Sequence, residues 1–206
     1  MIADGGEDRR LRDKEVFFDR LAPEWHGENL LTPRERDLIL TALPNGELPR
    51  TGPILDLGGG TGRLAEFFHR ISASPLLVLD LSRRMLSHSP PAHFHRLQGD
   101  AHFLPLRERS VGLVFCYCAF PHFERKAEVV RECRRILRPG GCLVILHGRG
   151  REEINRFHSA GSEVIAGDHL PPLPAFRNWG KAAGMIPERL RDSRESFIVR
   201  YRKPVP

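Results

Sequence analysis

The sequence contains no long hydrophobic run and no segment that resembles a secretory leader. No apolar stretch approaches the roughly 20 residues that cross a bilayer. The first ten residues are polar and carry both signs of charge, whereas a signal peptide has an apolar core. We therefore expect no membrane span and a cytoplasmic location.

Cysteine is scarce as well. The four cysteines, at positions 116, 118, 133 and 142, form no C-x-x-C pair and no second pair at zinc-finger spacing. This pattern argues against a disulfide framework and favours buried free thiols in a reducing compartment. Cys118 is the exception, because it falls at a strand end and faces the site predicted below.

Extended basic runs are missing too. The formal net charge is +6, but the arginines are spread through expected helices and loops. We interpret this charge as a solvated surface and do not expect a nucleic-acid partner. The 206 residues are enough for one domain with a sizeable core.

What the sequence does contain is a glycine-rich turn after a short apolar strand. Residues 53–62 read PILDLGGGTG, and a helix-like stretch follows. Glycine lets the backbone approach a ligand and adopt positive φ, and the helix start offers unpaired N–H groups. The turn predicts a cradle for a nucleotide-type cofactor. It fits a dinucleotide fingerprint poorly, because the third glycine position falls on Arg63.

Strand-like and helix-like segments alternate along the rest of the chain. Asp80 closes the second strand about 20 residues after the glycine loop, the spacing of an acid that binds ribose hydroxyls. The alternation predicts an α/β fold with a doubly wound, mostly parallel, seven-stranded Rossmann-like sheet. The expected later segments are strands at 76–79, 111–116, 142–146, 185–191 and 195–202, and a helix at 124–137.

Four stretches in this order resemble the class I S-adenosylmethionine-dependent methyltransferases. The resemblance is strongest to the small-molecule, methyltransferase type 11-like branch, which includes the menaquinone and ubiquinone C-methyltransferases. The stretches are ILDLGGGTGRL, VLDLSRRML, QGDAHFLPL and RRILRPGGCLVI. The resemblance covers roughly residues 14–146. It implies S-adenosylmethionine as the cofactor and an antiparallel C-terminal hairpin at the sheet edge.

The resemblance also implies roles for single residues. Gly58 and Gly60 would let the loop wrap the methionine part of the cofactor, and Asp56 would order the loop or reach the amino group through water. Asp80 would accept hydrogen bonds from both ribose hydroxyls, with Leu81 packed on the adenine face.

Two later strand ends would complete the cofactor site. Asp100 would accept from the adenine amino group, and the Ala101 amide would donate to the ring. Backbone from Cys116 to Cys118 would bind the methionine ammonium. One departure is Val111-Gly112, where relatives often carry a Phe-Asp pair. That acid usually has a structural role, so we expect binding to persist.

The N-terminal part resembles the lid of these enzymes. Residues 17–25 read FFDRLAPEW, and Trp25 would meet the cofactor as the lid closes. Thr32, Pro33 and Glu35 form the signature of a helix start. We therefore expect a helical lid over residues 1–50 and a cofactor-binding domain over 51–206, with an insertion-like region at about 148–184.

The histidines are the candidates for chemistry. His147 follows an expected strand at the carboxyl rim, where ligands bind in open sheets, and His122 lies in the loop after the fourth strand. Both are candidate catalytic residues, with His158 as a possible partner. Because His147, His158 and His169 are accompanied by carboxylates in the sequence, a divalent metal site is a further possibility. Surface or structural histidines are the alternative.

The expected function is transfer of a methyl group to a small-molecule acceptor by in-line displacement. The acceptor atom, C, N, O or S, stays open, as does the oligomeric state. The alternative is a catalytically silent cofactor-binding or sensor protein, because the predicted residues indicate binding rather than chemistry.

Overall fold

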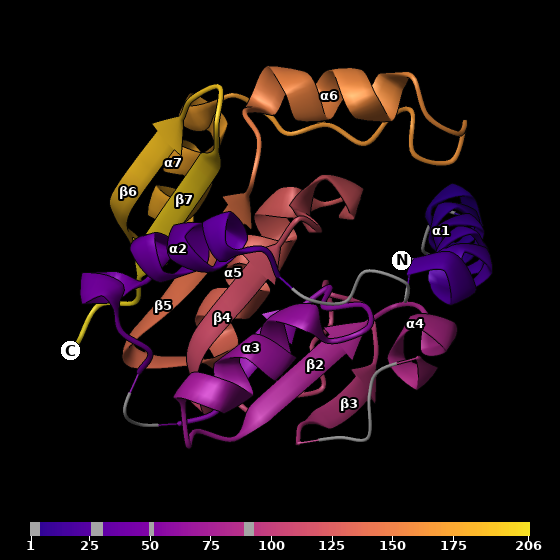
Figure 1. Ribbon diagram of the computed structural model, residues 1–206. Helices are drawn as coiled ribbons and strands as arrows, with labels where there is room; N and C mark the ends of the chain where they lie inside the picture. The colour runs from indigo at the N-terminus through magenta and orange to yellow at the C-terminus, as the bar shows by residue number, and fades with distance from the viewer. Residues whose placement is uncertain (1–4, 26–30, 50–51, 89–92) are drawn as a thin grey trace.

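The computed structural model describes residues 5–25, 31–49, 52–88 and 93–206. A seven-stranded sheet in the order β3-β2-β1-β4-β5-β7-β6 forms its centre, with helices on both faces (Figure 1). The strands are β1 (Ile54–Leu57), β2 (Leu76–Asp80), β3 (His95–Gln98), β4 (Val111–Tyr117), β5 (Leu137–His147), β6 (Ile186–Asp192) and β7 (Phe197–Arg202). The first five strands pair in parallel, while β7 is antiparallel to both β5 and β6. The predicted sheet and its C-terminal hairpin are confirmed.

Seven α-helices surround the sheet in the described part of the chain. They are α1 (Gly5–Trp25), α2 (Pro33–Ala42), α3 (Arg63–Ile71), α4 (Arg83–Ser87), α5 (Lys126–Ile136), α6 (Arg151–Ser159) and α7 (Leu173–Ala182). Short 3₁₀ turns cover Pro44–Gly46 and Phe120–His122. None of the described helices is long and apolar enough to cross a membrane.

The two faces of the sheet are covered by different helices. One hydrophobic cluster joins the sheet to α5 and α7, through residues such as Val130 and Phe176. The other joins it to α2 and α3, through residues such as Ile39 and Phe68. Each of these four side chains has an exposed fraction of 0%. The central strands β1, β4 and β5 are therefore buried on both sides, as parallel sheets require.

The two N-terminal helices differ in how they join this core. α2 begins with the predicted capping box, in which the Thr32 hydroxyl accepts the Glu35 N–H and the Glu35 carboxylate accepts the Thr32 N–H. Its Ile39 and Ala42 are fully buried. α1 instead packs along α4 beyond the carboxyl ends of the strands, and α6 lies across the same end (Figure 1). The domain boundary at residue 50 stays a prediction.

The structure differs from the sequence prediction between α5 and β5. The expected helix ends at Ile136, and the strand begins already at Leu137 rather than at Cys142. Leu137 pairs with Val111 across a register shift. Gly141 permits this pairing, because a Cβ there would lie 2.9 Å from the Gly112 carbonyl oxygen. The Pro-Gly-Gly segment thus extends the strand rather than ending the helix in a loop.

Asp56 is a carboxylic acid inside this core. It lies in β1 with an exposed fraction of 2%, and its Oδ2 has no hydrogen-bond partner among the described residues. Burial raises the pKa of Asp56 to about 7, and the neighbouring Asp80 adds to the rise. Because the folded protein holds this proton more tightly than the unfolded chain, folding is favoured while the group is protonated.

We predict that this acid makes the free protein less stable at higher pH. The contribution of Asp56 to the free energy of unfolding is largest near pH 4 and is lost as the pH rises through about 7. Relative to Asp56→Asn, the wild type should lose about 2 to 3 kcal/mol between pH 5 and pH 8. Urea unfolding of both proteins at the two pH values measures this difference. If the wild type and Asp56→Asn differ in free energy of unfolding by the same amount at pH 5 and pH 8, Asp56 is ionised while buried.

Candidate functional site

A cavity of about 200 Å³ lies where β1, β2 and β4 end. Its walls come from the loops after these strands and after β3, and from α1, α2 and α3. The residues that line it are Leu11, Lys14, Phe18, Trp25, Glu35, Asp56, Gly58, Gly59, Gly60, Thr61, Arg63, Leu64, Leu79, Asp80, Leu81, Met85, Gly99, Asp100, Ala101, His102, Tyr117, Cys118, Ala119, His122 and Phe123. Most of the residues predicted for the cofactor are therefore gathered in one cavity.

The glycine loop forms one wall. Gly58 and Gly59 donate their N–H groups to the Leu79 carbonyl, at 2.7 and 3.2 Å, which fixes the loop against the end of β2. Gly58 and Gly60 have φ of 70° and 55°, a conformation that favours glycine. A Cβ at Gly58 would lie 2.5 Å from the Ala119 Cβ, whereas one at Gly60 would meet nothing closer than 3.9 Å. Gly58 is needed for packing, and Gly60 borders open space.

Asp80 holds this loop from the neighbouring strand. Its Oδ2 accepts the Gly60 N–H and its Oδ1 accepts the Ser82 N–H, both at 2.8 Å. Burial raises the pKa of Asp80, while these two hydrogen bonds lower it. Both carboxylate oxygens are thus oriented by backbone donors, and each retains acceptor capacity for hydroxyl groups. Leu81, the next residue, lines the cavity beside it.

Asp100 and Ala101 follow β3 on the far side of Asp80. The Asp100 carboxylate accepts from the His102 N–H at 3.0 Å and from its ring Nδ1 at 2.5 Å. The other ring nitrogen, Nε2, accepts the Arg125 N–H at 3.0 Å, so Nδ1 carries the proton. Burial tends to raise the pKa of Asp100, but the hydrogen bonds from His102 lower it overall. Asp100 is therefore an ionised acceptor, with His102 as a partner that the sequence prediction missed.

The segment after β4 forms the opposite wall. Cys116 has an exposed fraction of 0% and does not line the cavity, whereas Cys118 does. Cys118 has φ of 58°, and such a conformation in a residue with a side chain is concentrated at functional sites. Tyr117 donates its hydroxyl to Glu35 at 2.9 Å, and Arg63 donates to the same carboxylate at 3.2 Å.

Glu35, Arg63 and Tyr117 were not predicted as site residues. Glu35 had a recognisable helix-capping role, and its second role depends on Tyr117, which is 82 residues away in the sequence. The cluster places one carboxylate and one guanidinium at the same end of the cavity. It can therefore bind a group that carries both an ammonium and a carboxylate.

His122 enters the cavity from the 3₁₀ turn after β4, and a buried acid holds its ring. The Nδ1 atom lies 2.7 Å from Oδ2 of Asp168, in the segment between α6 and α7. Oδ1 of Asp168 accepts from Lys14 of α1, also at 2.7 Å. Asp168 was noted in the sequence only as a carboxylate near the histidines, and Lys14 was not singled out. His122 is the one predicted catalytic histidine that lines the cavity.

The other predicted histidines lie behind or away from the cavity. His147 ends β5 as expected, but its exposed fraction is only 3%, because β7 pairs alongside and Phe197 packs against its ring. Burial lowers the pKa of His147 to about 3, with His122 and His158 adding to the effect. His158 is also buried, with its ring centroid 4.9 Å from that of His122. His169 is exposed and hydrogen-bonds to Gly167 and Ser159.

The possible metal site is not supported. Among the described residues, no group of three or more His, Cys, Asp and Glu side chains has an arrangement that could hold a metal ion. His147 and His158 each keep one buried ring nitrogen that has no partner in the described structure. His169, the third predicted ligand, is exposed.

α1 closes the cavity from above. Phe18 contacts the His122 ring edge-on at 5.0 Å between centroids, and Trp25 lines the cavity while remaining 51% exposed. Asp19 fixes the helix to α4, because its Oδ1 accepts from the Ser82 hydroxyl and the Arg84 N–H. Trp25 is thus on the helix that was predicted to act as a lid.

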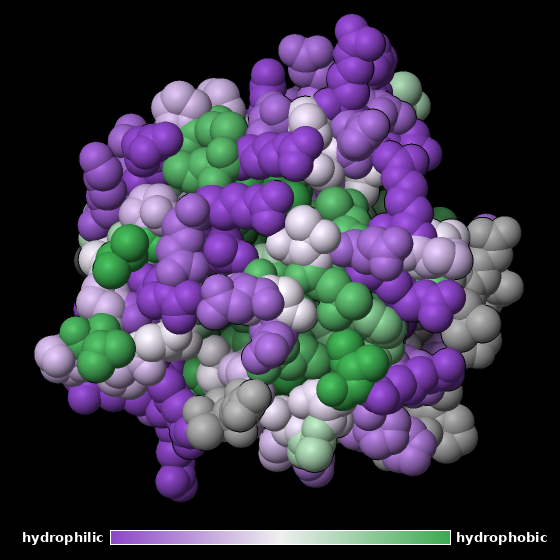
Figure 2. Space-filling model, turned by 60° about the vertical axis from the view of Figure 1, so that its left-hand side comes forward, coloured by the Kyte–Doolittle hydropathy of each residue, from purple (hydrophilic) through white to green (hydrophobic). Residues whose placement is uncertain are grey.

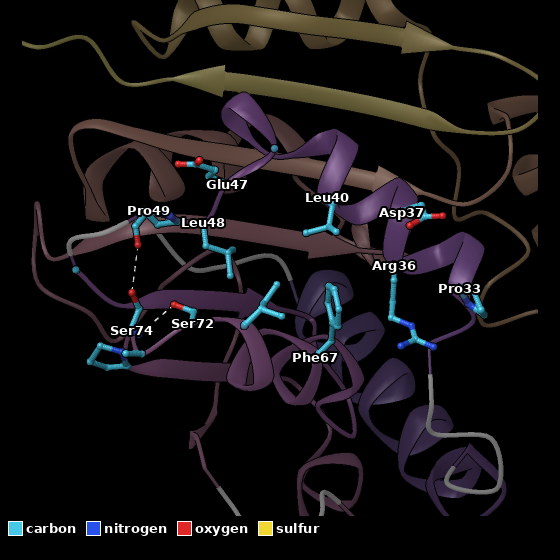
Figure 3. A pocket seen from close by; sticks show the side chains of 15 residues that line it. Pro33, Arg36, Asp37, Leu40, Glu47, Leu48, Pro49, Phe67, Ser72 and Ser74 are labelled. Carbon is cyan, nitrogen blue, oxygen red and sulfur yellow. Dashed lines mark hydrogen bonds between the residues drawn. The ribbon is translucent and has the colours of Figure 1, made fainter.

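A larger hollow, of about 980 Å³, lies between α2 and α3 near the amino ends of the strands (Figure 3). Leu40, Leu48 and Phe67 line it, and the nearby Ser74 hydroxyl donates to the Pro49 carbonyl. Figure 2 shows hydrophobic side chains between hydrophilic ones on one face of the molecule. None of the predicted site residues lines this hollow, so size does not identify the functional cavity.

Comparison with known proteins finds methyltransferases among both the sequence relatives and the solved structures. Residues 55–145 match the family described as a methyltransferase domain. The chain is 27% identical over 213 residues to dimethylglycine N-methyltransferase of Parasynechococcus marenigrum, covering 92% of this chain and 74% of that protein. It is 42% identical over 103 residues to malonyl-[acyl-carrier protein] O-methyltransferase of Methylococcus capsulatus, covering 46% of this chain and 37% of that protein.

Further relatives agree in family and in fold. Demethylmenaquinone methyltransferase of Thermotoga maritima is 36% identical over 142 residues, which cover 63% of this chain and 59% of that protein. The matched part of the chain thus spans only 37% of the malonyl-[acyl-carrier protein] O-methyltransferase and 59% of the demethylmenaquinone methyltransferase. The solved structure of Haemonchus contortus phosphoethanolamine N-methyltransferase 2, in complex with phosphomonomethylethanolamine and S-adenosylhomocysteine, has a TM-score of 0.72 at 18% identity and covers 95% of this chain and 59% of that chain.

The matched domain begins in β1 and ends in β5, so it includes the glycine loop, Asp80, Asp100 and the turn that carries His122. The sheet order and the antiparallel β7 agree with the fold that the resemblance implied. By the sequence match over residues 55–145 and by its fold, this chain is similar to the class I S-adenosylmethionine-dependent methyltransferases.

Proposed function

We propose that this protein transfers a methyl group from S-adenosylmethionine to a small-molecule acceptor by in-line displacement. The observation that carries the proposal is the composition of one cavity. Asp80 and Asp100 line the part suited to adenosine, and His122 lines the part beneath α1. A cofactor and an acceptor can therefore meet in a space that the lid helix shields from water.

The residues present fit this cofactor. Gly60 borders open space, so a ligand can approach the loop backbone, and Asp80 offers two oriented carboxylate oxygens to a pair of ribose hydroxyls. Asp100 and the Ala101 amide suit the adenine edge. Asp56 has a buried oxygen without a partner in the described structure, directly below the loop. An ammonium group nearby would supply the missing positive charge.

The cofactor, when bound, supplies an electrophilic methyl group on a sulfonium. Glu35 and Arg63 are proposed to bind the ammonium and the carboxylate of its methionine part, in place of the predicted Cys116. Cys118 and Trp25 border the space next to it. We assign the catalytic role on the acceptor side to His122, and we assign His147 and His158 to support of its ring from behind.

The relatives support a small acceptor without fixing its identity. Their names specify dimethylglycine, malonyl-[acyl-carrier protein] and demethylmenaquinone, so N-methyltransferases and O-methyltransferases both occur among the proteins similar to this one. Turnover against a panel of thiols, phenols, quinols and amines tests the proposal. A protein that binds S-adenosylhomocysteine and methylates none of them would instead be the silent cofactor-binding protein.

We predict that Asp80→Ala weakens the binding of S-adenosylhomocysteine by about 1.5–3 kcal/mol, because hydrogen bonds to a carboxylate are lost. Isothermal titration calorimetry measures the change. Asp37→Ala is the matched control, since Asp37 is exposed and lines the other hollow. Equal affinity of the Asp80 variant and the wild type would exclude the ribose assignment.

Deleting residues 1–30 should leave a folded sheet but remove most turnover. Neither hydrophobic cluster takes a member from α1 among the described residues, so the core does not depend on that helix. The deletion removes Lys14, Phe18 and Trp25 from the cavity wall and opens it to water. Circular dichroism and the acceptor panel measure the two effects. Full activity of the truncated protein would show that α1 only packs on the surface.

A further inference from the structure

Two lysines fix the backbone on both sides of His122. Lys14 of α1 donates to the His122 carbonyl at 2.7 Å. Lys126 of α5 donates to the carbonyls of Pro121 and Phe123, at 2.9 and 2.7 Å. Three successive carbonyls are therefore bound by ammonium groups. Because charged hydrogen bonds are strong where water is excluded, this short turn is held more firmly than an ordinary connecting loop.

Asp168 fixes the ring of the same residue. Its side chain is 7% exposed, and its two oxygens bind different partners, Lys14 and His122. Burial tends to raise the pKa of Asp168, but the hydrogen bonds from His122 and Lys14 lower it overall. An ionised carboxylate can only accept, so Nδ1 of His122 carries a proton and donates it to the bond.

The other ring nitrogen of His122 is left for the cavity. Nε2 has no hydrogen-bond partner among the described residues, and the side chain is 18% exposed where it lines the cavity. Asp80 lies close enough to interact with His122 electrostatically. The remaining groups that face the ring are His158 from α6, His147 from β5 and Phe18 from α1. With Nδ1 donating to Asp168, Nε2 is the ring atom that can accept a proton.

We infer that Asp168 is a positioning residue that makes His122 a general base for the methyl acceptor. This inference rests on the proposed function and extends it to the class of substrate. A base helps only where the atom to be methylated carries a proton of high pKa. The acceptor is therefore an alcohol, a phenol or a carbon acid rather than a tertiary amine.

In the proposed step, His122 accepts a proton from the acceptor while the methyl group leaves sulfur. Nε2 of His122 takes the proton from the acceptor atom, which forms its new bond to the methyl carbon. The electron pair of the broken carbon–sulfur bond stays on sulfur. The imidazolium that results is stabilised by its Nδ1–H bond to Asp168, and it later releases the Nε2 proton to water.

Lys14 connects this pair to the lid. It lies on α1 and binds both Asp168 and the His122 carbonyl, with Glu124 as a further partner at 2.6 Å. The helix that covers the cavity therefore also supplies the charge that holds Asp168 in place.

The tautomer of His122 can be measured directly. Long-range ¹H–¹⁵N spectra of the full chain, labelled at histidine and saturated with S-adenosylhomocysteine, distinguish the two ring nitrogens, and His122→Gln identifies the signals. We expect Nδ1 to be protonated and Nε2 bare in the wild type. In Asp168→Asn the amide group can donate to Nδ1, so the proton should move to Nε2. A wild-type ring protonated at Nε2 would overturn the inference, whether or not the protein shows turnover.

Kinetic measurements distinguish a positioning role of Asp168 from a purely structural role. Asp168→Asn should lower kcat by about 10²–10⁴-fold with a phenol as the probe acceptor, while the Kd of S-adenosylhomocysteine stays unchanged. Asp192→Asn is the matched control, because Asp192 also pairs with a basic side chain, that of Arg151, but is not the acid that binds the His122 ring. Undiminished kcat in Asp168→Asn would overturn the inference.

A separate turnover measurement tests the predicted class of acceptor. Turnover of N,N-dimethylglycine that equals the best phenol, and that Asp168→Asn leaves unchanged, would also contradict the inference. Failure of the wild type to bind S-adenosylhomocysteine would refute the proposed function instead, and the tautomer would still decide whether Asp168 fixes the ring.

Discussion

Parallel pairing of β1 with β2 on one side and with β4 on the other is the constraint on which the site depends. Asp56 of β1 is in register with Val78 and Phe115, so the three strands end at the same edge of the sheet. The glycine loop, Asp80 and the turn that carries His122 emerge there together. The Leu79 carbonyl then binds two loop amides. The sheet thus provides the rigid base on which a cofactor loop can be held open.

The carboxylate groups at this edge of the sheet differ in how many hydrogen bonds they accept. Asp80, Asp100 and Asp168 each accept hydrogen bonds from defined donors, whereas Asp56 keeps one oxygen without a partner in the described structure. Burying ions is costly even when they are paired. A Lys14–Asp168 pair is therefore weak evidence for stability, and its position behind His122 argues for a role in the site. The network also joins α1, the turn after β4 and the segment between α6 and α7.

Local sequence patterns predicted the local parts of this arrangement. The glycine loop, the α2 capping box and the strand that ends at Asp80 each depend on neighbouring residues, and the structure contains them. The α5–β5 boundary was wrong, because Gly141 serves strand pairing with β4 rather than a loop. The side chain of His147 could not be placed from sequence, since its burial depends on Phe197 in β7. The partners of His122 were missed for the same reason: Asp168 is 46 residues from His122, and Lys14 is 154 residues from Asp168.

A crystal structure of the full chain with S-adenosylhomocysteine tests the central claim most directly. The account predicts the ribose hydroxyls at the Asp80 carboxylate, the adenine amino group at Asp100 and the thioether sulfur on the side of the cavity that contains His122. Adenosine bound in the hollow between α2 and α3, or bound in the cavity with Asp80 turned away from the ribose, would contradict it.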